Sequence, residues 1–216
     1  MSNAPAPLRQ GSPVKRAAIA RAALEVFVRE GYARASVDAI AASAGVSKRT
    51  IYDYYGDKEQ LFLSTLRETQ EAQTAAFNEL LDRTVGRFDD LEAALTRFGR
   101  EFAVEIARSA ERAAVMRLMI AEASHFPALL ERASAGSVQR ALADRLAELA
   151  ELGLLDIPDP MEAAEFLGLL VTGRVNNRSW YGAVQLDDAE IARLAAGGVQ
   201  IFLRAYRRPS ERQSGA

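Results

Sequence analysis

Hydrophobic residues recur at every third or fourth position along most of this chain, from Ile19 near its start to Ile201 near its end. That interval places them on one face of an α-helix, whereas a half-buried β-strand would alternate hydrophobic and polar residues. No segment of the sequence alternates in this way, and no segment repeats another. The pattern therefore predicts an all-α protein.

Capping residues and glycines indicate where the predicted helices begin and end. Gly31 follows the first apolar-faced segment as a helix-stopping residue, while Asp159 with Pro160, and later Asp187, have the pattern of helix starts. The predicted helices cover residues 13–30, 37–44, 48–55, 58–84, 89–109, 111–125, 127–152 with a break near 136, 160–183 and 187–207.

The stretch from Ser36 to Lys58 predicts two short helices joined by a tight glycine turn. Gly45 stands where the first helix must end in a left-handed conformation, and Ser47 can cap the second. Polar and cationic side chains are then predicted on the outer face of the second helix: Lys48, Arg49, Thr50, Tyr52, Asp53 and Tyr54. Such a helix fits the major groove of B-DNA, although helical hairpins without DNA share the same spacing.

This stretch resembles the DNA-binding segment of the TetR family of transcriptional regulators. The matching residues are Ala39-Ile40-Ala41, Ala44-Gly45-Val46-Ser47, Thr50-Ile51-Tyr52, Tyr54-Tyr55, Lys58-Glu59 and Leu61-Phe62. The resemblance covers roughly the first 65 residues. It implies a helix-turn-helix that binds double-stranded operator DNA.

The later part of the chain resembles the C-terminal domain of AefR-like members of the same family. The matching residues are Arg117-Leu118-Met119-Ile120-Ala121-Glu122-Ala123, Phe126-Pro127, Gly153-Leu154-Leu155, Asp159-Pro160, Ala163-Ala164 and Phe166-Leu167-Gly168-Leu169. This resemblance implies a protomer of about nine helices whose last two helices pair with those of a second copy.

The DNA-binding candidates divide into backbone and base contacts. The resemblance implies sugar-phosphate contacts at four donor-bearing residues: Lys48, Tyr52, Tyr54 and Lys58. Arg49 and Thr50 are our candidates for base edges, because a guanidinium can bind guanine O6 and N7 together and a threonine methyl can meet thymine. The hydroxyls of Ser36 and Ser47 either cap their helices or bind a phosphate oxygen. Asp53 can pair with Arg49, accept from a cytosine amine, or remain solvated.

The last two predicted helices carry more apolar surface than one core can cover. Apolar residues nearly encircle the penultimate helix: Phe166, Leu167, Leu169, Leu170, Val171 and Val175. The adjacent glycines Gly197 and Gly198 would cost an isolated helix about 1 kcal/mol each, so a second helix is expected to pack closely against them. Both features predict a homodimer formed through these helices. Such a dimer would present two helix-turn-helix domains to a palindromic site.

Members of the family usually bind a small molecule in the C-terminal domain, so polar groups on apolar faces are effector candidates. Our candidates are Phe77, Phe98, Phe102, Met116, Met119, Arg174, Asn177, Arg178, Trp180 and Tyr181. The alternative is that the arginines form ion pairs and that the aromatic and methionine side chains belong to the core.

Composition narrows the function further. Residues 1–60 hold nine basic and six acidic residues, and the remainder holds 18 and 23, so a net charge of −2 hides a basic N-terminal part. The absence of cysteine excludes disulfides and thiolate chemistry. The sequence has one histidine, no paired carboxylates on an apolar face and no phosphate-binding loop. We therefore expect no enzyme, no metal site and no cofactor. Without a leader or a membrane-spanning segment, we expect a cytoplasmic protein with no membrane contact.

Together these features predict a homodimeric repressor that a small-molecule effector releases from a palindromic operator. The alternative is a TetR-type DNA-binding protein without an effector, whose larger domain serves only dimerisation or a protein partner. The expected organisation is a disordered arm over residues 1–12, a DNA-binding domain over 13–57, an effector-binding and dimerisation domain over 58–208, and a disordered tail over 209–216.

Overall fold

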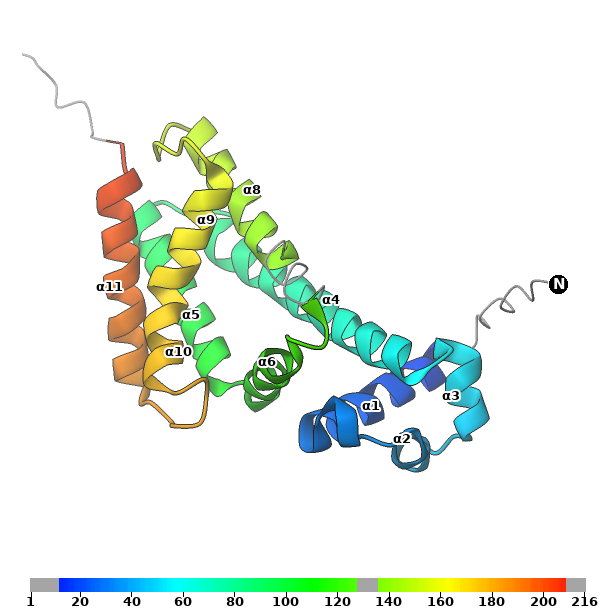
Figure 1. Ribbon diagram of the computed structural model, residues 1–216. Coiled ribbons are helices and arrows are strands. Elements are labelled where there is room, and N and C mark those ends of the chain that lie inside the picture. Colours follow the sequence, from blue (N-terminus) through cyan, green and yellow to red (C-terminus); the bar gives the residue numbers. More distant parts are fainter. Residues whose placement is uncertain (1–11, 128–135, 209–216) are drawn as a thin grey trace, which may run out of the picture. The chain divides into compact units, whose positions relative to one another are not determined.

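The computed structural model describes residues 12–127 and 136–208, and most of these residues are helical (Figure 1). The helices are α1 (Pro13–Arg34), α2 (Val37–Ala44), α3 (Lys48–Tyr55), α4 (Lys58–Val85), α5 (Leu91–Arg108), α6 (Ala110–Glu122), α8 (Ser137–Glu151), α9 (Pro160–Gly168), the π-helical turn η1 (Leu169–Gly173), α10 (Arg174–Arg178) and α11 (Asp188–Tyr206). Since α9, η1 and α10 are continuous, the described residues form nine helical segments, and their only β-structure is an isolated bridge between Leu155 and Arg207. The all-α prediction is confirmed.

The chain divides into two compact units. The N-terminal unit comprises residues 12–72 together with 117–127, and the C-terminal unit comprises 73–116 together with 136–208. The N-terminal unit is therefore larger than the domain predicted to end at residue 57, because the first part of α4 and the end of α6 belong to it. The predicted arm up to residue 11, the predicted tail and residues 128–135, the first part of the helix predicted to begin at Pro127, lie outside the described residues.

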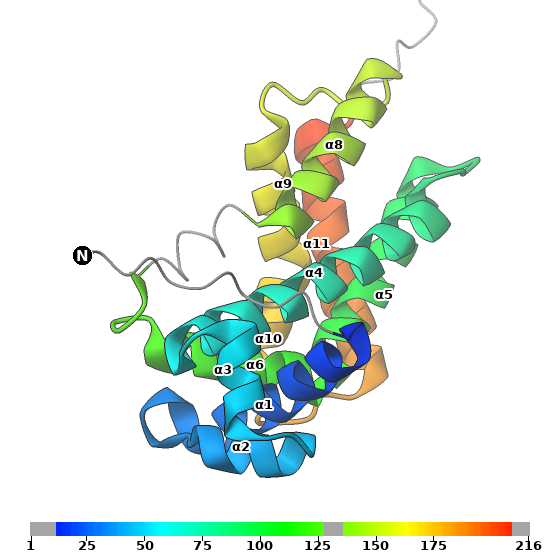
Figure 2. The ribbon, with the colours of Figure 1, turned by 90° about the vertical axis from the view of Figure 1, so that its right-hand side faces the viewer.

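Helices α1, α2 and α3 form the predicted helix-turn-helix domain (Figure 2). The Ser36 hydroxyl accepts from the amides of Asp38 and Ala39 at 3.2 and 3.4 Å and so caps α2. Gly45 ends that helix with φ 65°, a conformation that glycine adopts without a steric penalty. The Ser47 hydroxyl accepts from the Thr50 amide at 3.1 Å and caps α3.

The end of α6 packs into the N-terminal unit, which the sequence did not predict. The Glu122 carboxylate is buried and accepts from the Tyr32 amide at 2.9 Å, directly after Gly31 interrupts α1 with φ 76°. The Phe126 ring lies 4.8 Å from the Tyr32 ring and 5.2 Å from the Phe62 ring, measured between centroids. These contacts attach the end of α6 to α1 and α4 within the N-terminal unit.

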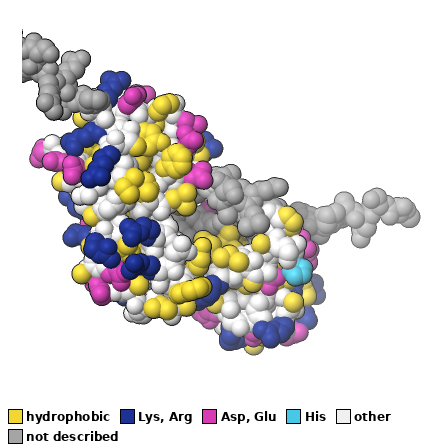
Figure 3. Space-filling view, turned by 60° about the vertical axis from the view of Figure 1, so that its left-hand side comes forward, with side chains coloured by type: hydrophobic (Ala, Val, Ile, Leu, Met, Phe, Trp, Pro, Cys, Tyr) yellow, Lys and Arg dark blue, Asp and Glu magenta, His cyan; other side chains and the backbone are white. Residues whose placement is uncertain are grey.

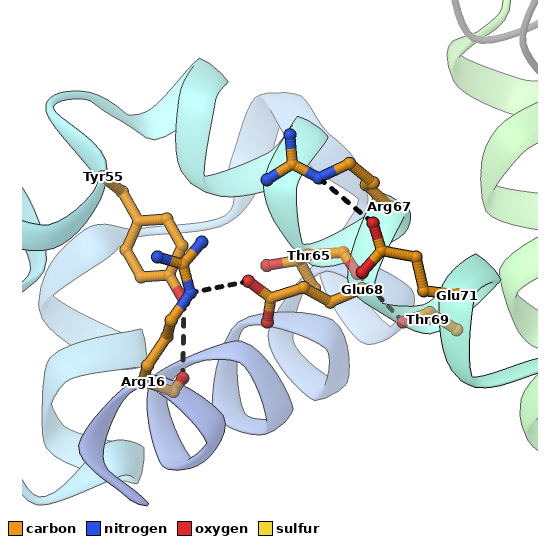
Figure 4. Close-up of polar contacts among 7 residues, drawn as sticks. All are labelled: Arg16, Tyr55, Thr65, Arg67, Glu68, Thr69 and Glu71. Carbon is orange, nitrogen blue, oxygen red and sulfur yellow. Dashed lines mark hydrogen bonds and ion pairs between the residues drawn. The ribbon is translucent and has the colours of Figure 1, made fainter. Parts of the chain in front are cut away.

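A polar cluster joins α1 to α4 (Figure 4). The Arg16 guanidinium donates to the Glu68 carboxylate at 2.9 Å, and this hydrogen bond raises the pKa of Arg16. The same guanidinium lies 5.2 Å from the centroid of the buried Tyr55 ring. The Tyr55 hydroxyl donates to the Arg16 carbonyl at 3.3 Å. Tyr55 therefore packs inward with its hydroxyl at the edge of the core.

Burial raises the pKa of Tyr55 to about 12 from an ordinary value of 10.0, which makes stability depend on alkaline pH. Between these values the unfolded state has lost the phenolic proton and the folded state still holds it, so the free energy of unfolding falls as pH rises. We expect a loss of about 2 kcal/mol from pH 10 to 12 beyond that of Tyr55→Phe. Urea unfolding of both proteins at several pH values measures the difference, and parallel pH profiles would refute it.

The core of the C-terminal unit is formed by α5, α8, α9 and α11 with the last turns of α4. Three buried phenylalanines, Phe77, Phe98 and Phe102, lie with ring centroids 4.9–5.8 Å apart. The helical run from α9 to α10 lies alongside α11 (Figure 1), and α11 also packs against α5. Asp159 and Asp187 cap α9 and α11 through bonds to amides within the first turn, as predicted.

The adjacent glycines of α11 have different surroundings. A Cβ on Gly198 would lie 2.3 Å from the Leu170 carbonyl oxygen and 2.6 Å from its carbon, so α11 meets the backbone of η1 at this residue. A Cβ on Gly197 would meet no atom within 4 Å. The close approach that we expected from a second protomer is thus made at Gly198 within the same chain, and only Gly197 faces open space.

The penultimate helical run ends five residues earlier than predicted. Its last helical residue is Arg178, and a turn follows in which Trp180 and Tyr181 have left-handed φ values of 48° and 52°. The Tyr181 amide donates to the Asn176 carbonyl at 2.8 Å, and the Val184 amide donates to the Ser179 carbonyl at 2.8 Å. Tyr181 therefore lies beyond the end of the helix that carries Arg174, Asn177 and Arg178, although we predicted that this helix would extend to residue 183.

Candidate nucleic-acid interface and ligand cavity

Most side chains predicted to bind DNA lie on the surface of the helix-turn-helix. Ser36, Ser47, Lys48, Arg49 and Tyr52 are exposed, and Thr50 is half-buried. The Lys48 ammonium donates to Asp38 at 2.8 Å, and this hydrogen bond raises the pKa of Lys48, so the lysine stays cationic at neutral pH. The Ser47 and Thr50 hydroxyls lie 2.9 Å apart. The outer face of α3 thus presents cations and hydroxyl groups, which suit phosphate and base contacts.

One expectation about α3 is wrong, and one of the alternatives for Asp53 is not observed. Tyr54 is only 7% exposed, so it packs into the core of the domain instead of facing outward with Tyr52. Arg49 and Asp53 form no ion pair in the part of the chain that the structure describes, although they stand four residues apart on α3. Both Arg49 and Asp53 are exposed, so the guanidinium of Arg49 is held by no neighbouring carboxylate.

Lys58, at the start of α4, is held against the end of α1. Its ammonium donates to the Ala33 carbonyl at 3.2 Å and lies 4.6 Å from the centroid of the Tyr32 ring. An ammonium has three donors, so two of them are left for an external acceptor. The Asp57 carboxylate accepts from the Gln60 amide at 2.7 Å and caps α4 in front of this lysine.

Two family models match the chain over the regions just described. Residues 19–65 match the model for bacterial regulatory proteins of the tetR family. Residues 93–208, which are more than half of the chain, match the model for the C-terminal domain of AefR-like transcriptional repressors. The chain belongs to the TetR family. It is a DNA-binding transcriptional regulator with an N-terminal helix-turn-helix, as the sequence predicted.

Curated transcriptional regulators match less than half of this chain. The transcriptional repressor TetR of Mycobacteroides abscessus is 37% identical over 87 residues, which are 40% of this chain and 44% of that protein. The transcriptional activator FasR of Mycolicibacterium smegmatis is 34% identical over 84 residues, which are 39% of this chain and 38% of that protein. The matched segment thus spans less than half the length of either relative.

Solved TetR-family structures match nearly the whole chain. A transcriptional regulator from Mesorhizobium loti has a TM-score of 0.82 and 26% identity, covering 91% of this chain and 100% of that one. A regulator named FrrA and described as flavonoid-responsive has a TM-score of 0.70 and 30% identity, covering 92% of this chain and 100% of that one. The structural resemblance therefore extends beyond the helix-turn-helix domain.

The C-terminal unit contains a cavity of about 190 Å³. Its apolar wall includes Phe102, Ile106, Met116 and Val138. Its polar wall includes Gln73, Arg112, Asn176, Ser179 and Tyr181. These residues come from α4, α5, α6, α8, α10 and the turn after α10, so segments that are far apart in the sequence together line the cavity.

Three of the predicted effector residues line this cavity, namely Phe102, Met116 and Tyr181. The other candidates do not line it. Phe77 and Phe98 are buried in the core of the C-terminal unit, and Met119 is buried in the N-terminal unit. Arg174, Asn177 and Trp180 are exposed outside the cavity, and Arg178 forms an ion pair with Glu190. For Phe77, Phe98 and Arg178 the alternative reading, core packing or ion pairing, describes the observed contacts.

Arg112 and Asn176 were missed as cavity residues. Arg112 stands in the first turn of α6, where the sequence gives it the appearance of a solvated charge, and nothing in the sequence distinguishes Asn176 from its neighbour Asn177, which we had chosen. In the described ranges, 12–127 and 136–208, no group of three or more histidine, cysteine, aspartate or glutamate residues is arranged to hold a metal ion. None of the helices described is both long and apolar enough to span a membrane.

Proposed function

We propose that this protein is a homodimeric repressor that leaves a palindromic operator when a small molecule binds in the C-terminal unit. The observation that carries the proposal is the pairing of an exposed cationic reading helix, α3, with a cavity in a separate unit of the same chain. DNA and the effector would each favour a different conformation of the protein. Each ligand would therefore weaken binding of the other. We place the protein in the cytoplasm, where the operator is.

The dimer proposal is supported by an unpaired apolar surface. Phe166 and Leu169 on the α9–η1 run are 44% and 58% exposed, and Ile201 on the neighbouring α11 is 53% exposed. Together these three side chains form what we call the apolar face. Hydrophobic side chains form patches between charged groups over the C-terminal unit in Figure 3. Exposed apolar patches of this kind mark interaction sites, and a two-fold contact would bury each residue twice.

The effector proposal is supported by the cavity and by the description of FrrA as flavonoid-responsive, since FrrA shares 30% identity with this chain. The alternative, a regulator without an effector, calls for a collapsed interior in the C-terminal unit. A cavity of about 190 Å³ with several polar side chains in its wall favours the effector-binding reading instead.

The DNA-reading proposal predicts different effects for two cationic residues. Arg49→Ala should cost about 1–3 kcal/mol of binding free energy at one operator position, because only a base contact carries sequence information. Lys58→Ala should weaken binding to all sequences and lower the salt slope by about 0.9, because it removes one phosphate contact. Fluorescence-anisotropy titrations with operator and scrambled duplexes at several salt concentrations measure both quantities.

Lys15, on α1 and outside the α2–α3 pair, provides a cationic control for Arg49→Ala, and Lys15→Ala should leave the base preference at every operator position unchanged. If Arg49→Ala weakened operator and scrambled DNA equally, its assignment to a base edge would be refuted. A base-specific loss for Lys58→Ala would likewise refute its assignment to the phosphate backbone.

A further inference from the structure

The volume of the cavity matches a ligand with about one ring. A cavity of roughly 150 Å³ lined by apolar side chains accommodates benzene. At about 190 Å³, the cavity of the C-terminal unit has room for a ring and a few additional heavy atoms. Phe102, Ile106 and Met116 supply apolar surface against which such a ring can pack.

The positive charge of Arg112 in the cavity wall is balanced by a carboxylate that lies behind the wall, that of Glu105. Arg112 lines the cavity with its side chain 16% exposed, and its guanidinium donates to the Glu105 carboxylate at 3.0 Å. The pair is neutral as a whole, so a cationic ligand would meet the guanidinium and a carboxylate ligand would bring a second anion close to Glu105. An uncharged ligand avoids both costs.

The cavity also offers hydrogen-bonding groups that the protein does not use. The side-chain amides of Gln73 and Asn176 make no hydrogen bond within the described part of the chain, and a guanidinium has five N–H donors, of which Glu105 takes only some. The Ser179 hydroxyl differs, because it donates to the Asn176 carbonyl at 3.2 Å and accepts from the Gly182 amide at 3.1 Å. Donors for an oxygen acceptor are therefore available at Arg112 and the two amides.

We infer that the cavity binds a compact, uncharged molecule with an apolar, ring-sized body and an oxygen acceptor that Arg112 and Asn176 recognise. The inference rests on the effector-binding part of the proposed function and specifies its ligand class. The turn that contributes Ser179 and Tyr181 also carries Trp180, the single tryptophan of the chain, beside the cavity wall. Ligand binding should therefore change the intrinsic fluorescence.

Four probes of similar size separate charge from hydrogen bonding: acetophenone, benzoate, benzylammonium and ethylbenzene. Titration calorimetry on the full chain without DNA, with Trp180 fluorescence as a second readout, gives their affinities. Acetophenone should bind at least about 10-fold more tightly than each of the others, since a hydrogen bond to a charged donor has roughly that effect on affinity. Benzoate or benzylammonium as the tightest probe, or equal binding of ethylbenzene, would overturn the inference.

Substitutions test the recognising residues. The double variant Arg112→Met with Glu105→Gln keeps the wall neutral and should lose about 10-fold in acetophenone affinity, as should Asn176→Leu. Arg174→Met is the matched control, because Arg174 is exposed outside the cavity, and it should bind like the wild type. Unchanged acetophenone affinity in both cavity variants would overturn the inference.

A gel-shift assay with operator DNA separates this inference from the proposed function. If the protein shifts operator DNA while no probe binds, the ligand class is wrong and the DNA-binding function stands. If acetophenone binds as predicted while no operator is shifted, the ligand class is supported and the regulatory function fails.

Discussion

Gly198→Ala is expected to lower the free energy of unfolding by about 3 kcal/mol, at the upper end of the usual cost of overpacking a core. The new Cβ would lie 2.3 Å from the Leu170 carbonyl oxygen, and a backbone atom in a helix cannot rotate away as a flexible side chain can. Relief requires α11 to move away from η1 and from the Val199 contact with Gly99 on α5. Urea unfolding followed by circular dichroism measures the change.

Gly197→Ala is the matched control because it makes the same change one residue earlier in the same helix. No atom lies within 4 Å of its added Cβ, so the variant should remain within about 1 kcal/mol of the wild type, with helix propensity favouring alanine. Equal destabilisation by the two substitutions would contradict the close packing of α11 on η1.

Leu169→Glu is expected to raise the dissociation constant of the proposed dimer by about 1,000-fold or more. A two-fold interface contains the substituted residue twice, and each copy loses about 1.5–3 kcal/mol of apolar burial and adds an unpaired carboxylate. The variant should still fold, because Leu169 is already 58% exposed in the protomer. Sedimentation equilibrium measures the dissociation constant, and circular dichroism checks the helix content.

Leu152→Glu provides the control, since this leucine is 70% exposed at the end of α8 and lies outside the apolar face. It should dimerise like the wild type. A dimer that survives Leu169→Glu, or that dissociates with Leu152→Glu, would show that the contact lies elsewhere on the protein.

The elements that could be predicted from the sequence are those fixed by local chemistry. Ser36, Gly45 and Ser47 set the helix-turn-helix because a hydroxyl cap and a left-handed glycine act within one turn of the backbone. Asp159 and Asp187 located two further helix starts for the same reason. Apolar spacing identified the core faces of these helices without any knowledge of the tertiary structure.

The errors arose where tertiary contacts decide. Gly198 is explained by the backbone of η1, which no local pattern places beside it. Apolar spacing continued through Tyr181, but two left-handed residues end the helical run at Arg178 and carry Tyr181 to the cavity wall. Arg112 has the pattern of a solvated charge, and only the folded structure brings it beside Asn176.

Selection of bound duplexes from a random DNA pool, at an ionic strength where the protein is dimeric, tests the central claim most directly. The account predicts enrichment of an inverted repeat whose half-sites are separated by about one helical turn, roughly 34 Å, or slightly more. Enrichment of a single half-site without a symmetric partner, or no enrichment even at low salt, would contradict it.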